Sequence, residues 1–155
     1  MGLSEAGVNV LENQIVEITR EGESITLMGI DDPSFQENYL FGDSEGVAKQ
    51  AIETLLRVSD GYTVLLSHRP ELFELYVETG MDLVFSGHAH GGQFRLPFIG
   101  GLVAPNQGFF PKYDAGLFSE ENTNMIVSRG VGNSIVPVRF NNRPEIILVT
   151  LSNSK

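Results

Sequence analysis

The chain opens with two short runs rich in β-branched residues. Residues 14–19 and 24–30 carry most of the Ile, Val and Thr in this region, and a polar turn containing Gly22 separates them. Two such runs around a glycine-containing turn are typical of a β-hairpin. The polar stretch 31–43, which contains Pro33, is expected to be a loop.

From Ser44 the apolar residues recur every three or four positions, which predicts an amphipathic helix. The residues that carry this period are Val47, Ala51, Ile52, Leu55, Leu56 and Val58. Asp43 or Ser44 is the expected N-cap, and Gly61 ends the segment. A second helix is expected after Pro70, because proline is favoured at the first helical position, and this helix should stop at Gly80.

Two almost wholly apolar runs, residues 62–67 and 82–86, enclose the second helix. Runs without polar alternation are typical of parallel strands that are buried on both faces, so the segment predicts a βαβ unit in an α/β fold. Beyond Gly87 the chain is richer in glycine and proline, and further strands are expected at residues 125–128, 135–140 and 145–151.

Composition narrows the class of protein. With 155 residues, 41% hydrophobic and 19% charged, the chain fits a single globular domain spanning residues 1–155. A net charge of −10 disfavours any electrostatic grip on nucleic acid or on an anionic membrane. The absence of cysteine excludes disulfides, thiolate zinc sites and cysteine nucleophiles. No apolar run is long enough for a transmembrane helix.

All three histidines follow predicted strands. His68 comes directly after the run 62–67, and His88 and His90 come directly after the run 82–86. These positions are the carboxyl ends of parallel strands, where open α/β sheets place their ligand sites. A lone histidine is more often a packing or surface residue. Three at one sheet edge favour a metal site, because neutral imidazole is the commonest metal ligand.

Two segments around these histidines resemble a known family. Residues 67–71 (Ser-His-Arg-Pro-Glu) and 86–93 (Ser-Gly-His-Ala-His-Gly-Gly-Gln) are similar to the last two signature blocks of the calcineurin-like metallophosphoesterases, notably the bacterial phosphohydrolases and phosphodiesterases. The likeness continues through residues 29–33, 96–97, 111–117, 128–132 and 143–146. It implies the C-terminal half of a four-layer α/β/β/α sandwich, with a βαβ unit and a mixed sheet.

The resemblance also implies a chemistry. In that family His68 and His88 would serve one metal ion and His90 a second, and the complete domain would hydrolyse phosphomonoesters or phosphodiesters with two divalent ions (Mn, Fe or Zn). The family's earlier blocks (Asp-x-His, Gly-Asp-x-x-Asp and Gly-Asn-His-Asp/Glu) do not occur here. We therefore expect a chain that lacks the N-terminal ligand motifs, holds one ion or none alone, and is inactive alone. No catalytic residue is assigned.

Other residues have weaker interpretations. Gln93 and Arg129 are candidate substrate contacts, although for Arg129 a structural salt bridge is the favoured reading. Asp31 and Asp32 precede Pro33, which favours an Asx-type turn over a role at the substrate edge.

Two rival functions remain open: a non-catalytic module that pairs with a partner half or with itself, and a mononuclear zinc hydrolase with a His₃ site. If half of a domain is missing, a strand edge and apolar surface around Val64, Leu66, Val84 and Phe85 should be exposed and should promote association. The expected partners are thus a phosphate ester for the complete protein and, for this chain, a second copy or the missing half. Location is open: cytoplasmic is the default, and full-length relatives are often membrane-anchored or exported.

Overall fold

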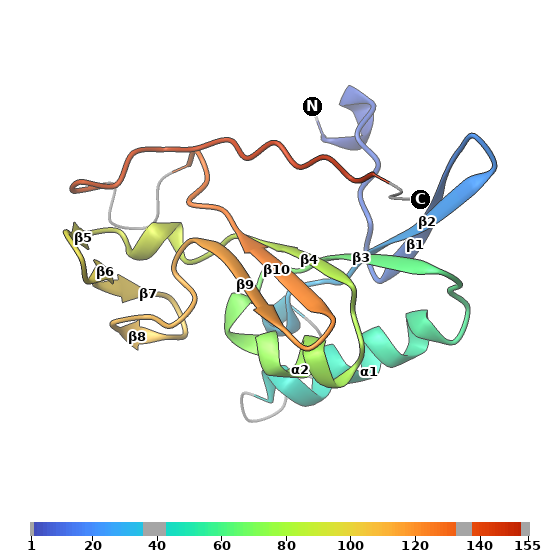
Figure 1. Ribbon diagram of the computed structural model, residues 1–155, viewed down its shortest axis with the longest axis horizontal. Helices are drawn as coiled ribbons and strands as arrows, with labels where there is room; N and C mark the ends of the chain where they lie inside the picture. The colour runs from blue at the N-terminus through green and yellow to red at the C-terminus, as the bar shows by residue number, and fades with distance from the viewer. Residues whose placement is uncertain (1, 36–42, 133–137, 153–155) are drawn as a thin grey trace.

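The computed structural model describes residues 2–35, 43–132 and 138–152. A six-stranded mixed sheet, ordered β1-β2-β3-β4-β10-β9, forms its centre, with α1 and α2 on one side (Figure 1). The strands are β1 (Gln14–Arg20), β2 (Glu23–Gly29), β3 (Tyr62–Leu66), β4 (Leu83–Ser86), β9 (Gly116–Glu120) and β10 (Thr123–Val127). The α-helices are α1 (Ser44–Leu56) and α2 (Phe73–Glu78).

Shorter elements connect these. The 3₁₀ turns are η1 (Ser4–Ala6), η2 (Pro33–Phe35), η3 (Pro70–Leu72) and η4 (His90–Gly92). Two small antiparallel ribbons follow η4, formed by β5 (Arg95–Leu96) with β6 (Gly100–Gly101) and by β7 (Val103–Ala104) with β8 (Gly108–Phe109). None of the helices in the described ranges is long and apolar enough to cross a membrane.

The predicted hairpin and first helix are confirmed. Strands β1 and β2 pair antiparallel. Asp43 caps α1, because its Oδ1 accepts a hydrogen bond from the Gly46 amide at 2.8 Å. The helix ends at Leu56, and Val58, expected on its apolar face, is 70% exposed.

The βαβ unit is also confirmed. Strand β3 runs parallel to β4, and η3 and α2 make the connection between them. Strand β2 is parallel to β3, and β10 is parallel to β4, so four neighbouring strands end at the same sheet edge. The sheet is mixed because the outer strands β1 and β9 pair antiparallel with β2 and β10.

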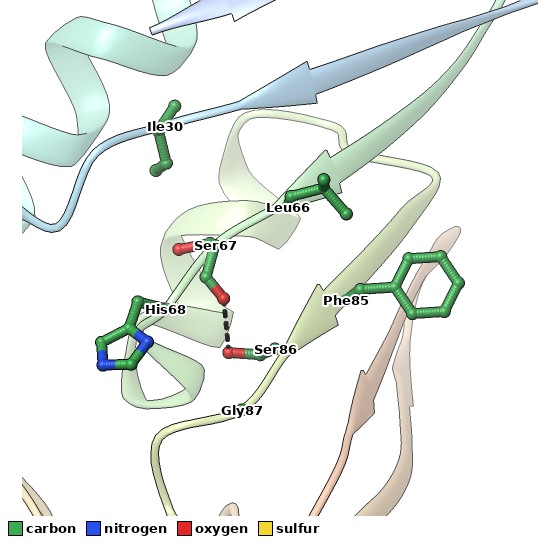
Figure 2. Close-up of a pocket in the computed structure, with 7 residues that line it drawn as sticks. All are labelled: Ile30, Leu66, Ser67, His68, Phe85, Ser86 and Gly87. Atoms are coloured by element: carbon green, nitrogen blue, oxygen red, sulfur yellow. Dashed lines mark hydrogen bonds between the residues drawn. The ribbon is translucent and has the colours of Figure 1, made fainter. Parts of the chain in front are cut away.

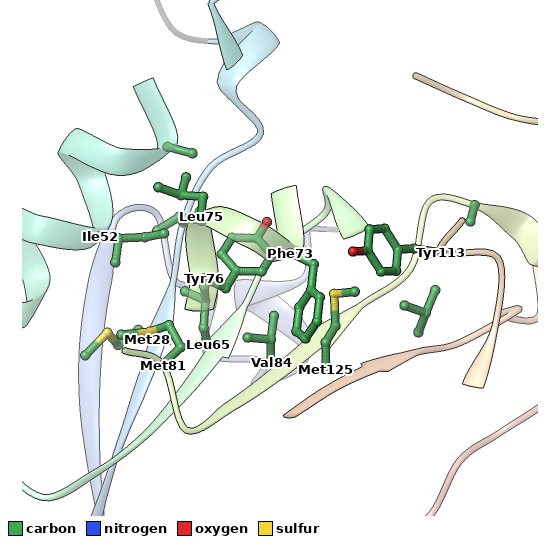
Figure 3. Close-up of a cluster of buried hydrophobic side chains, with 14 of the residues drawn as sticks. Met28, Ile52, Leu65, Phe73, Leu75, Tyr76, Met81, Val84, Tyr113 and Met125 are labelled. Atoms are coloured by element: carbon green, nitrogen blue, oxygen red, sulfur yellow. The ribbon is translucent and has the colours of Figure 1, made fainter. Parts of the chain in front are cut away.

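The hydrophobic core lies between the sheet and its two helices (Figure 3). Alternate strand residues point to this side, as the period of two in a strand requires. The fully buried members include Met28, Leu65, Val84 and Met125 from the strands and Ile52, Phe73 and Tyr76 from the helices.

The expectation that the parallel strands are buried on both faces is confirmed for the middle of β3 and β4, where Val64 and Leu65 face opposite sides and are 3% and 0% exposed. The expectation that Val64 and Val84 belong to an exposed apolar surface is therefore wrong, because they are 3% and 0% exposed.

The sheet is open at its outer strands and at the end of β3. By register, Val16, Ile18, Leu66 and Leu117 share the face opposite the helices, and their exposed fractions lie between 37% and 66%. Within the described residues no helix covers this face. An extended C-terminal segment passes over it (Figure 1), and its residues 145–147 line a pocket together with Phe85 and Ile126.

Two predicted strands need correction. Residues 145–151 are extended but pair with no strand of the described chain, and Ile146 and Leu148 are 89% and 92% exposed. The expected strand 135–140 lies partly outside the described residues, and its last residue, Phe140, forms an isolated bridge with Phe94. In contrast, β9 was not expected. It forms a hairpin with β10 through a turn at Glu121, whose φ is 52°.

Candidate metal centre

The structure places all three histidines beyond the carboxyl ends of β3 and β4. His68 lies two residues after β3, His88 lies two residues after β4, and His90 begins η4. The rings of His68 and His88 are in contact, with centroids 4.2 Å apart and planes tilted by 48°. The shared sheet edge therefore follows the sequence-based expectation, and two of the three imidazoles meet directly.

The backbone around His88 and His90 is unusual. Both residues have positive φ, 61° and 47°, a conformation that non-glycine residues seldom adopt. Gly92 adjoins them with φ 72°, and a Cβ on it would lie only 2.3 Å from the Gly101 Cα. The turn after β4 is thus held tightly against β6, which fixes where the two histidines emerge.

Polar contacts also support this turn. Asn142, which is 3% exposed, donates from Nδ2 to the His90 carbonyl oxygen at 2.6 Å and to the Gln93 carbonyl oxygen at 3.2 Å. Arg95 donates to the Gly91 carbonyl oxygen at 2.9 Å and to Asp114 at 2.8 Å. The loop that carries His90 is therefore tied to two distant parts of the chain.

The environment of His88 keeps its ring neutral. Burial, together with the nearby His68 and Arg69, lowers the pKa of His88 to about 4. Burial also lowers the pKa of His90, with contributions from the Arg139 charge and from His68. Metal binding to imidazole requires the neutral form, so the donor chemistry of these residues suits a divalent transition metal.

Asn106 is a contact of the site that the sequence did not reveal. Its side-chain amide nitrogen lies 2.9 Å from His88 Nε2. Asn106 has a positive φ of 58°, which asparagine tolerates in turns. In a sequence such an asparagine indicates a turn and no distant partner. The contact joins the loop between β7 and β8 to the histidine pair, and it occupies one of the two nitrogens through which His88 could bind a metal.

The described donors do not form a complete metal site. In the part of the chain that the structure describes, no three His, Asp, Glu or Cys side chains are arranged to hold a metal. The nearby carboxylates have other partners: Asp31 accepts from Asn13 Nδ2 at 2.8 Å, and Asp32 is bound by Arg69. The assignment of all three histidines as ligands stays a prediction.

A pocket of about 340 Å³ opens beside His68 (Figure 2). Its walls are the ends of β2, β3 and β4, and Figure 2 shows Ser67 and Ser86 joined across it by a hydrogen bond from Ser86 Oγ to the Ser67 carbonyl oxygen. Leu66, which is 39% exposed on the face opposite the helices, is one of the lining residues.

The other candidates have structural partners. Arg129 makes the salt bridge that the sequence favoured: its Nε donates to Glu145 Oε2 at 2.8 Å, and its Nη2 binds the same oxygen. Asp32 forms the expected Asx-type turn by accepting from the Ser34 amide at 2.9 Å. Gln93 directly follows η4, and its proposed contact with substrate stays a prediction.

Comparison with known proteins identifies relatives with a consistent description. The chain is 37% identical over 102 residues to the uncharacterized metallophosphoesterase YkuE of Bacillus subtilis, covering 65% of this chain and 35% of that protein. It is 31% identical over 149 residues to the phosphodiesterase YaeI of Escherichia coli, covering 96% of this chain and 49% of YaeI.

A third relative has a more specific name. The UDP-2,3-diacylglucosamine pyrophosphatase LpxG of Chlamydia trachomatis is 37% identical over 92 residues, covering 56% of this chain and 28% of LpxG. The chain thus spans about half of the length of these relatives or less. No protein-family model matches it, and no solved structure does. From the histidine blocks, the mixed sheet and these relatives we conclude that the chain belongs to the calcineurin-like metallophosphoesterase superfamily, a family of phosphoester hydrolases.

Proposed function

We propose that the chain is the C-terminal half of a metallophosphoesterase domain and that His68, His88 and His90 are metal ligands of the complete domain. The observation that carries the proposal is the ring contact between His68 and His88 at the ends of two parallel strands. The names of the relatives support phosphate esters as substrates. Bound divalent ions would supply Lewis-acid stabilisation of the phosphoryl oxygens and lower the pKa of a water molecule.

The open sheet face supports the half-domain part of the proposal. A face that carries Leu66 and Leu117 in an exposed position is unusual in a finished fold, because exposed apolar patches mark interaction surfaces. The exposed Ile146 and Leu148 lie on an extended segment with no strand neighbour in the described chain. A second sheet packed over this face would bury both the exposed sheet residues and the exposed residues of the C-terminal segment. It would also complete a four-layer sandwich, with residues 1–155 as one unit of that domain.

We assign separate roles to the residues of this chain. His68 and His88 hold one ion in the isolated chain, and His90 contributes to a second ion only when further ligands are supplied. Gln93 contacts the substrate from the turn after η4. Arg129 would have to exchange its Glu145 partner for a phosphate to do the same. A self-sufficient His₃ zinc hydrolase has no observation in its favour, since the described donors do not converge in threes.

We expect the isolated chain to hydrolyse a model phosphodiester, bis(4-nitrophenyl) phosphate, at a negligible rate with added Mn²⁺. The sequence lacks the family's blocks that would carry the carboxylate ligands and a proton donor. Loss of even one stabilising group in a reaction centre costs on the order of 10²–10³ in rate. Release of nitrophenolate is the readout. Addition of a polypeptide that carries the three missing blocks should restore turnover.

The control for this experiment is the same mixture with the His88→Ala variant, which should stay inactive. Metal-dependent turnover by the isolated chain that disappears in His88→Ala would contradict the half-domain proposal. Failure of every tested complement to restore turnover, with both polypeptides folded and associated, would contradict the assignment of these histidines to a phosphoesterase centre.

Association is the second expected property, and the open apolar face favours it. We expect light scattering at micromolar concentration to give a mass above 17.0 kDa that rises with concentration, because apolar sheet surface and unpaired strand edges promote pairing. Leu117→Asp, on the open face, should shift the population toward the monomer. Val58→Asp, equally exposed but after α1, is the matched control and should not. A mass of one chain at all concentrations would rule association out.

A further inference from the structure

The residues on both sides of His68 are hydrogen-bonded to one buried hydroxyl group. The Tyr76 phenol donates to the Arg69 carbonyl oxygen at 2.6 Å, and its oxygen lies 2.7 Å from Ser67 Oγ. Since the phenol has a single proton and gives it to Arg69, the Ser67 hydroxyl is the donor in the second bond. Ser86 completes the arrangement by donating to the Ser67 carbonyl oxygen at 2.9 Å. The residues before and after His68 are thus both anchored.

These anchors are out of reach of water. Tyr76 is fully buried, and Ser67, Arg69 and Ser86 are each less than 9% exposed. A buried polar group that loses its partner cannot recover the hydrogen bond from solvent. The backbone next to His68 therefore has a strong preference for the single arrangement in which every one of these groups is paired.

An ion pair fixes the same turn from the side. The Arg69 guanidinium binds Asp32 in a bidentate manner, with Nε 2.8 Å from Oδ2 and Nη2 2.6 Å from Oδ1. Asp32 is itself held by the Ser34 amide and hydroxyl. The turn after β3 is in this way tied to the segment that follows β2, so the two neighbouring strand ends cannot move independently.

We propose that Tyr76, acting with Ser67 and Ser86, is a positioning residue that sets the His68 ring against the His88 ring before any metal binds. Tyr76 acts through the Ser67 hydroxyl and the Arg69 carbonyl oxygen, on either side of His68. This inference rests on the proposed role of His68 as a metal ligand. Groups that orient metal ligands without binding the metal typically change metal affinity by about 10–100-fold when they are removed.

The test compares Tyr76→Phe with a matched control, Tyr113→Phe. Tyr113 is also buried, at 4% exposed, but its hydroxyl donates to Glu74 Oε1 at 3.0 Å and not to a residue next to His68. Two quantities are measured on the 155-residue chain: the nuclear Overhauser effect between ring protons of His68 and His88, and the Zn²⁺ dissociation constant by chelator competition. Tyr76→Phe should weaken the ring contact and lower the affinity about 10–100-fold. Tyr113→Phe should change neither.

The outcomes separate this inference from the proposed function. A ring contact and a Zn²⁺ affinity that both survive in Tyr76→Phe would overturn the positioning role. If the wild-type chain binds no Zn²⁺, the proposed function fails, and the ring contact alone decides whether Tyr76 positions His68. If Tyr76→Phe does not fold, Ser67→Ala removes the donor to Tyr76 while leaving the bond to Arg69, and an unchanged ring contact in that variant would overturn the inference.

Discussion

Arg69→Met is expected to lower the free energy of unfolding by about 3–5 kcal/mol, because it leaves a buried carboxylate without its cation. The side chains of Arg69 and Asp32 are 7% and 8% exposed, so water cannot replace the lost partner. Methionine keeps most of the aliphatic volume of arginine, so the variant removes mainly the guanidinium group and its bonds to Asp32 and Glu71. A loss of this size is a large fraction of the total stability of a small domain. Urea unfolding at pH 7, followed by circular dichroism, measures it.

Arg129→Met is the matched control for this prediction. Arg129 also forms a two-pronged pair, with Glu145, but these side chains are 28% and 22% exposed, so the loss should be nearer about 1 kcal/mol. Equal losses of unfolding free energy in the two variants would contradict the prediction that the buried Arg69–Asp32 pair contributes more than the more exposed Arg129–Glu145 pair.

The pH dependence of the Arg69→Met effect gives a second check. Burial alone would raise the pKa of Asp32, but hydrogen bonds from Arg69 and Ser34 hold it well below its usual range. A carboxyl with a depressed pKa in the folded state stabilises that state above the ordinary aspartate pKa, about 3.9, and loses this contribution as the pH falls. The difference in unfolding free energy between wild type and Arg69→Met should therefore shrink below about pH 4. A constant difference would contradict the assignment.

Elements whose local pattern and tertiary surroundings agree could be predicted from the sequence. The hairpin β1–β2, the Asp43 cap of α1 and the βαβ unit from β3 to β4 each carry a clear period or stop signal. The apolar run 145–151 has equally strong β-branched character but forms no strand, because a strand exists only with a neighbour to share its hydrogen bonds. Strand β9 does form, because β10 is its neighbour. Its own sequence pattern is weak, with Gly116 at its start and Ser119 within it.

The meeting of His68 and His88 could be predicted from the sequence, whereas the contacts that hold them in place could not. The strand order puts residues that follow β3 and β4 at one edge, so the meeting of His68 and His88 follows from the sequence. The contact of Asn106 with His88 depends on a loop conformation that no spacing encodes. The pair of Arg69 with Asp32 joins residues 37 positions apart, which only the parallel pairing of β2 with β3 brings together.

Metal binding is the second large expected effect. We expect the isolated chain to bind one Zn²⁺ ion through His68 and His88, whose rings are already in contact. Replacement of either ligand should cost more than the roughly 10–100-fold in affinity that follows loss of an outer hydrogen-bond partner. His90→Ala is the matched control, because we assign His90 to a second ion that the isolated chain cannot hold.

Isothermal titration of the chain with Zn²⁺, repeated for His68→Ala, His88→Ala and His90→Ala, tests the central claim most directly. The predicted result is one ion per chain in the wild type, loss of binding in the first two variants, and nearly unchanged binding in the third. No binding by the wild type, or equal binding by the wild type and His88→Ala, would contradict the claim that these histidines form a metal centre.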